Sequence, residues 1–187
     1  IIEIFIRVVL VVGLYVFIGN SGVISFGHIG FTCLGAYMTA WLTMLPAIKK
    51  SKLKGLPDII LNNKLAYGWG LLAAVIFAAI AAYIVGKVLM RLSGIAASIA
   101  TFAVLAVIIQ VYSNWDSVTG AQSSVVGIPI VRVVWPYFLC AIVVVIVAYL
   151  HQISRSGLAL RAARDEATAA SASGVNIPRE RLIAFTL

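Results

Sequence analysis

The sequence predicts an all-α fold, a bundle of helices that crosses a membrane several times. The first observation is composition, because 63% of the residues are hydrophobic, 11% are charged and the mean hydropathy is +1.09. A soluble domain carries about a quarter of its residues charged. The second observation is the spacing of the charges, which leaves long runs without Asp, Glu, Lys or Arg at 8–48, 65–86, 92–115 and 133–150.

The charge-free runs give the expected spans. About 20 apolar residues, rising 1.5 Å each, cover the hydrocarbon core of a bilayer. We expect one transmembrane domain over 1–187, with spans at about 1–18, 29–45, 66–89, 94–112 and 134–150 and another beginning at 181–187. The chain begins with Ile1 and stops inside an apolar segment, so we expect a fragment of a longer protein. Glu3 and Arg7 are spaced to pair along the first helix.

The first charge-free run is too long for one span and is interrupted by small and polar residues. The interruption reads Gly19-Asn20-Ser21-Gly22, then Ser25-Phe26-Gly27-His28. Backbone amides inside a bilayer need partners, so a helix unwinds there only where protein or a water-filled cavity supplies them. Two alternatives follow, a tight turn outside the bilayer or a discontinuous helix that lines a path.

The net charge of +8 is concentrated in two segments between spans. One holds Lys49, Lys50, Lys52, Lys54 and Lys64, and the other holds Arg155, Arg161, Arg164, Arg179 and Arg181. Between membrane spans such charges set orientation and meet lipid head groups, so we expect no nucleic-acid partner. Three spans separate the two segments, which places them on opposite sides. With the arginines in the cytoplasm, the lysine segment 46–66 lies outside and departs from the positive-inside rule.

The sequence offers no catalytic or metal-binding set, so we expect no enzymatic activity of this chain. It has 6 acidic residues, 2 histidines and 2 cysteines, without the spacing of a metal site or a nucleophilic triad. Cys33 and Cys140 read as small buried hydrophobes. Residues 22–29 have the glycine spacing of a phosphate-binding loop but lack its lysine and its Ser or Thr. We therefore expect no cofactor on this chain, and any ATP to be bound by another subunit.

Two patterns concern helix packing. In the span predicted at 66–89, small residues recur at every fourth position, namely Ala74, Ala78, Ala82 and Gly86. Either this pattern allows a neighbouring helix to approach closely, or the span is simply rich in alanine. The next helix has a few polar groups, which either face the bundle interior or bond their own helix; they are Ser93, Ser98, Thr101 and Gln110.

The segment 151–180 has the signals of a helix, a turn and a second helix. Ser156 is expected to cap an alanine-rich helix over 158–172, and Gly174 suits its left-handed end. Asn176-Ile177-Pro178 then begins a helix that leads back to the membrane. Alanines beside charged residues suit docking to a partner, although a solvated helix at the membrane surface is the alternative.

Residues in this segment resemble the cytoplasmic coupling loop of branched-chain amino acid ABC transporter permeases, the LivM and LivH class. The stretch is Ser154-Arg155-Ser156-Gly157-Leu158-Ala159-Leu160-Arg161-Ala162-Ala163-Arg164-Asp165-Glu166, followed by Ala169-Ala170 and Gly174-Val175-Asn176. Other stretches resemble the same family in the same order: Ser25-Phe26-Gly27-His28 with Phe31 and Gly35-Ala36-Tyr37, then Arg91-Leu92-Ser93-Gly94 with Thr101, then Asn114-Trp115-Asp116, Thr119-Gly120 and Gly127-Ile128-Pro129. The LivM-like subunit is the closer fit.

Some positions depart from the family pattern and leave the substrate open. They are Val23, Ser93, Ala121, Ser124, Ala167 and Ser173. The resemblance implies a polytopic transmembrane helical bundle with a discontinuous helix and a cytoplasmic coupling helix, in the inner membrane of a bacterium or archaeon. It implies import of branched-chain amino acids, with urea or short amides as the alternative within the family. A channel, a secondary transporter or a non-transporting scaffold are alternatives from other classes.

The resemblance also implies partners and roles for residues. The partners are a LivH-like second permease, two cytoplasmic ATPase subunits that bind ATP and magnesium, an extracytoplasmic solute-binding protein and membrane lipid. The substrate path would include Ser21, Gly22, Ser25, Gly27, His28, Phe31 and Thr101. Coupling to the ATPase would use Arg155, Gly157, Arg161, Arg164, Asp165, Glu166, Ala169, Ala170 and Gly174.

Overall fold

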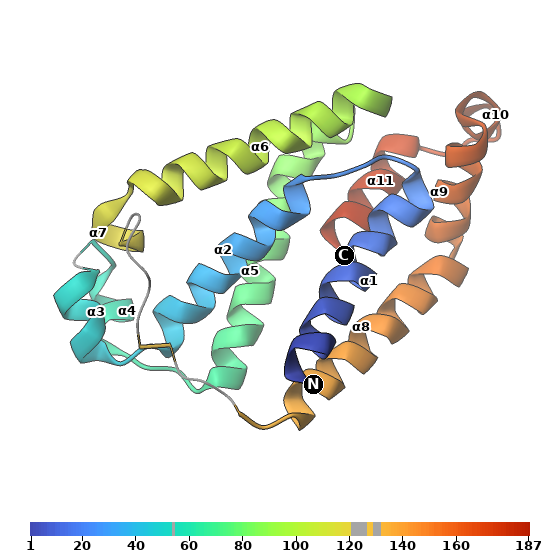
Figure 1. The fold of residues 1–187 in the computed structure, drawn as a ribbon. Helices are drawn as coiled ribbons and strands as arrows, with labels where there is room; N and C mark the ends of the chain where they lie inside the picture. The colour runs from blue at the N-terminus through green and yellow to red at the C-terminus, as the bar shows by residue number, and fades with distance from the viewer. Residues whose placement is uncertain (54, 121–126, 129–131) are drawn as a thin grey trace. The chain divides into compact units, whose positions relative to one another are not determined.

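The computed structural model describes residues 1–53, 55–120, 127–128 and 132–187, and all regular secondary structure in these ranges is helical (Figure 1). The helices are α1 (Ile2–Ser21), α2 (Gly27–Thr43), α3 (Pro46–Lys52), α4 (Asp58–Asn62), α5 (Tyr67–Leu89), α6 (Gly94–Asn114), α7 (Asp116–Thr119), α8 (Trp135–Ile153), α9 (Arg155–Asp165), α10 (Ala167–Ala172) and α11 (Ile177–Thr186). Lys54, Ala121, Ser124 and Pro129, which the sequence analysis names, lie outside the described residues.

The long helices lie where spans are predicted. By length and composition α1, α5, α6 and α8 can cross a membrane, and α2 is a 17-residue helix over the range predicted as 29–45. Along α1 only 11% of the most apolar stretch is buried within the chain. Apolar side chains exposed to this extent are what a helix presents to lipid or to other membrane helices.

The described chain divides into two compact units, which we treat separately. Unit 1 holds Ile1–Ser25, Ala82–Thr101 and Arg132–Leu187, and unit 2 holds Phe26–Ala81 and Phe102–Val131. The units divide α5 and α6, so each unit contains one part of both helices.

Unit 1 is built around α1, which packs along α8 and against α9 and α11 (Figure 1). Phe5 meets Phe138 of α8 edge to face at 5.4 Å, and Phe17 meets Phe185 of α11 at the same centroid distance. A Cβ on Gly86 would lie 2.8 Å from Phe185 Cδ1, so this glycine lets α11 approach α5 closely. The pairing predicted for Glu3 and Arg7 is confirmed, at 2.5 Å.

Unit 2 places α2 against the first part of α5 and the second part of α6. The Cβ of Ala78 is 3.9 Å from a Cβ built on Gly35, and a Cβ on Gly70 would lie 2.6 Å from Thr43 Cγ2. Ala74 is buried as well, so the small-residue side of α5 is a packing face, as the first alternative predicts. Beyond the end of α2, α3, α4 and α7 enclose an apolar cluster of Ala40, Met44, Leu53, Leu56, Leu61 and Val118.

The interruption predicted after the first helix is present. Helix α1 ends at Ser21, Gly22 takes the left-handed conformation with φ of 70°, and α2 begins at Gly27. Glycine adopts a positive φ without the steric cost of a Cβ, which explains its place at this helix end.

The segment 151–180 is helical but differs from the prediction in two ways. Ser154, not Ser156, caps the helix, because its hydroxyl accepts a hydrogen bond from the Gly157 amide at 3.2 Å. The single helix expected over 158–172 is also wrong, since the backbone is extended at Glu166, with φ of −149°, between α9 and α10. The Glu166 carboxylate accepts from the Thr168 amide and so begins α10.

The end of this segment agrees with the prediction. Gly174 has a φ of 86°, the left-handed conformation predicted for it. The Asn176 side chain accepts from the Arg179 amide at the start of α11, where Pro178 occupies the first turn. A side-chain cap followed by proline is a strong local signal for a helix start.

Candidate functional site

Arginines of the segment 151–187 donate to backbone carbonyls at a helix end and in a turn of unit 1. Arg161 Nη2 donates to the Gln152 carbonyl at the end of α8, at 2.8 Å. Arg181 Nη1 donates to the Leu92 carbonyl, in the turn between α5 and α6, at 3.2 Å. The last carbonyls of a helix lack partners within it and carry partial negative charge, so a guanidinium is well suited to the Gln152 carbonyl.

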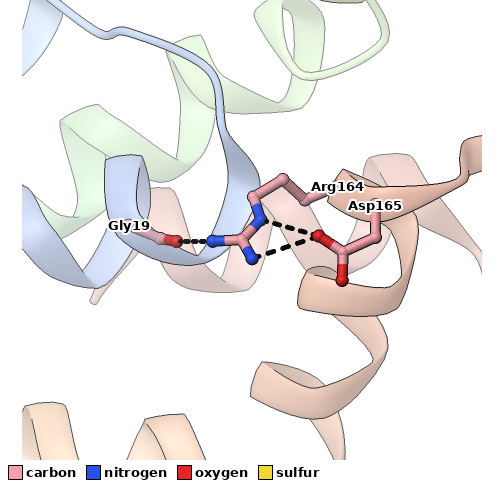
Figure 2. A network of polar contacts seen from close by, with 3 residues as sticks. All are labelled: Gly19, Arg164 and Asp165. Atoms are coloured by element: carbon pink, nitrogen blue, oxygen red, sulfur yellow. Dashed lines mark hydrogen bonds and ion pairs between the residues drawn. The ribbon is translucent and has the colours of Figure 1, made fainter.

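Arg164 makes the capping contact that joins the most distant parts of the chain. Its Nη1 donates to the Gly19 carbonyl in the last turn of α1 at 2.8 Å, across 145 residues of sequence. Asp165 accepts from the same guanidinium at 3.1 Å, which holds it in place (Figure 2). The interrupted segment and the charged segment, treated separately in the sequence, therefore meet in unit 1.

Two glycines make these contacts possible. A Cβ on Gly22 would lie 2.6 Å from Arg164 Cγ, so the arginine stem passes where any other residue has a side chain. A Cβ on Gly157 would lie 2.1 Å from the His151 carbonyl oxygen, far inside van der Waals contact. Because that neighbour is backbone, Gly157 is required for α9 to begin so close to the end of α8.

Another contact fixes α11 to the start of α9. The Ser156 hydroxyl donates to the Glu180 carboxylate. Ser154 also donates to the His151 carbonyl, at 2.6 Å, so the start of α9 is bonded to both of its neighbours. The segment is therefore a folded element attached to several helix ends.

The residues predicted to couple to an ATPase divide into exposed and buried sets. Arg155, Arg164, Asp165, Glu166, Ala169 and Gly174 are exposed. Gly157 and Ala170 are buried and Arg161 is half-buried, so these three contact their own chain. Arg164, although exposed, points its guanidinium at Gly19 (Figure 2). The surface open to a partner is thus formed mainly by Arg155, Asp165, Glu166 and Ala169.

The residues predicted to line a path are distributed over both units. Ser21, Gly22, Ser25 and Thr101 belong to unit 1, while Gly27, His28 and Phe31 belong to unit 2. Ser21 accepts a hydrogen bond from the Val23 amide at 3.2 Å. Thr101 is fully buried and also donates to the Ser98 carbonyl of its own helix at 2.8 Å, so it fits both alternatives stated for such residues. A path through these residues stays a prediction.

Gly19, Ser154 and Glu180 have roles in these contacts that the sequence patterns did not predict. Ser154 had a usable signal, because it stands three residues before the Gly157 amide that it caps. Gly19 acts through its backbone carbonyl, which any residue type would supply. Glu180 lies 24 residues from Ser156, and no local pattern indicates that pairing.

Comparison with known proteins gives one family over the whole chain. Residues 1–187 match the family described as branched-chain amino acid transport system / permease component. No curated protein and no solved structure matches the chain significantly.

Proposed function

Because this chain belongs to the branched-chain amino acid transport permease family, we propose that it is the membrane-spanning permease subunit of an ATP-driven importer. The family and the apolar helices make it a multi-pass membrane protein. We further propose that it lies in the inner membrane of a bacterium or archaeon. Its substrates are leucine, isoleucine and valine, and urea or short amides are the second candidate.

One observation carries the ATP-driven part of the proposal. The charged segment α9–α10 exposes Asp165, Glu166 and Ala169 while it is bonded to the ends of α1 and α8. Short side chains allow a partner to approach the backbone, and the charges fix its register. An ATPase subunit docked there would act on membrane helices through contacts already in place.

The proposal requires subunits that this chain does not contain. A second permease would complete the membrane assembly, two ATPase subunits would bind ATP and magnesium, and a solute-binding protein would deliver the amino acid. Movement of the ATPase pair would shift the equilibrium between inward-open and outward-open states of the permeases. The runs without charge argue against ion coupling inside the membrane, which normally uses a buried acidic or basic residue.

The test is reconstitution of the full-length permeases with their ATPase subunits and binding protein in liposomes. We expect ATP hydrolysis to rise when the binding protein and leucine are added together, and labelled leucine to be transported only with ATP. Stimulation by urea or acetamide in place of leucine would select the second candidate. Leucine transport without ATP would contradict the proposal and favour a channel or a secondary transporter.

A further inference from the structure

The carbonyl of Gly19 lies at the point where α1 stops and the non-helical segment begins. The next amide along the helical register belongs to Val23, which instead donates to the Ser21 hydroxyl at 3.2 Å. The Gly19 oxygen is therefore outside the helical hydrogen-bond pattern of α1 and accepts from Arg164 at 2.8 Å. One side chain of α9 thus supplies the partner that the end of α1 lacks.

The same arginine also packs against the first residue after α1. Gly22 leaves the space that the Arg164 stem occupies, with the nearest stem carbon 2.6 Å from the position of a Cβ. Asp165 restricts the guanidinium from the other side (Figure 2). A hydrogen bond, a close packing contact and an ion pair therefore act on one side chain, so a shift of α9 either carries Gly19 and Gly22 along with Arg164 or breaks these contacts.

We propose that Arg164 is the positioning residue that transmits movement of α9 to the end of α1 and to the turn at 22–25. The proposal rests on the proposed function and names the contact through which that function is carried out. Residues 22–25 are the part of unit 1 beside this contact whose backbone is not helical, so a displacement of α9 changes backbone angles there. Arg164 acts on α1 and is not a docking residue for the ATPase.

The first experiment compares Arg164→Ala with Arg179→Ala in the reconstituted complex. Arg179 is an exposed arginine at the start of α11, so its replacement removes the same charge from the same segment. Arg164→Ala should lower the ratio of stimulated to basal ATP hydrolysis by about fivefold or more, the range of measured coupling between sites. Both variants should capture wild-type amounts of ATPase. Loss of capture by Arg164→Ala would overturn the proposal, because it would make Arg164 a docking residue.

The second experiment replaces the contact with a reversible bond. A Cβ on Gly22 lies 3.8 Å from Arg164 Cβ, within the usual separation for a disulfide. The pair Gly22→Cys and Arg164→Cys is made with Cys33→Ala and Cys140→Ala, and the Gly22→Cys single variant controls for the left-handed backbone at that position. We expect the oxidised pair to regain substrate stimulation and the reduced pair to lose it again.

Each of the other possible results of this experiment contradicts a specific part of the proposal. If the disulfide does not form, or if the oxidised and reduced pairs show equal stimulation, the transmission role of Arg164 is wrong. If the oxidised pair is inactive, the contact must open during transport, which also overturns a rigid link. If the wild-type complex itself shows no stimulation, the proposed function fails, and disulfide formation still reports whether the contact exists.

Discussion

Lys49 belongs to the basic segment that is expected to meet lipid head groups, but in the structure its side chain is buried. It lies in α3, is fully buried, and its Nζ donates to the Ile60 and Asn63 carbonyls at 2.8 and 2.7 Å. Burial lowers the pKa of this ammonium, because desolvation disfavours the charged form, and the two carbonyls offset that penalty. Lys49 therefore joins α3 to α4 and is unavailable to lipid head groups.

We predict that Lys49→Met opens the α3–α4 region. Methionine keeps an apolar stem but removes both hydrogen bonds, each of which contributes about 1.5–3 kcal/mol net when it involves a charged donor; loss of the buried charge offsets part of this, because its desolvation penalty disappears. A net loss of about 1.4 kcal/mol would raise chymotrypsin cleavage at Leu53 and Leu61 about tenfold. Lys50→Met is the control, because Lys50 is exposed. Equal cleavage of the two variants would show that the Lys49 bonds do not hold the region closed.

At the scale of elements, two serines at the start of α9 have different hydrogen-bond partners. Ser154 caps the first turn of α9, while Ser156, the predicted cap, is bonded to Glu180 of α11. The two serines therefore have different functions although they are two residues apart. Ser154 stabilises α9 itself, and Ser156 joins α9 to the next helix.

Amide hydrogen exchange should separate these two functions. Ser154→Ala removes the cap, which costs about 1 kcal/mol, so exchange of the α9 amides should rise about fivefold. Ser156→Ala leaves the cap in place and should instead speed exchange in the first turn of α11. The assignment of the cap would be wrong if Ser156→Ala, and not Ser154→Ala, loosened α9.

The sequence predicted those features that depend on local signals. The left-handed Gly174, the helix start at Asn176 and the charge-free runs are local signals. The structure has Gly174 at positive φ, Asn176 as the cap of α11, and long helices within the runs. The division at Glu166 has no glycine or proline to indicate it, and a single helix was expected. The Arg164 contact with Gly19 joins residues 145 apart, so only the folded chain brings it about.

At the scale of the whole molecule, the family predicted from the resemblance is confirmed over residues 1–187. The arginine segment is attached to the ends of α1 and α8 and to the turn after α5, all within unit 1. These helix ends therefore lie on one side of unit 1, together with the charges that are expected in the cytoplasm. The lysine segment is expected on the other side of the membrane.

Cysteine labelling in intact cells should establish this orientation. Lys50→Cys and Arg179→Cys are each introduced with Cys33→Ala and Cys140→Ala, since Lys50 and Arg179 are both exposed. A membrane-impermeant maleimide should label the cysteine at 50 directly and the cysteine at 179 only after permeabilisation. The reverse pattern would invert the orientation, and labelling of both from outside would contradict an odd number of crossings between them.

The contact between Arg164 and Gly19 also has a consequence for biosynthesis. The chain must be extended by 145 residues beyond Gly19 before the partner of the Gly19 carbonyl exists. At typical rates of synthesis this takes on the order of ten seconds. During that time the Gly19 carbonyl lacks its Arg164 partner, which it can gain only after α9 has been synthesised. The end of α1 thus reaches its final conformation only after a segment 145 positions further along the chain has been translated.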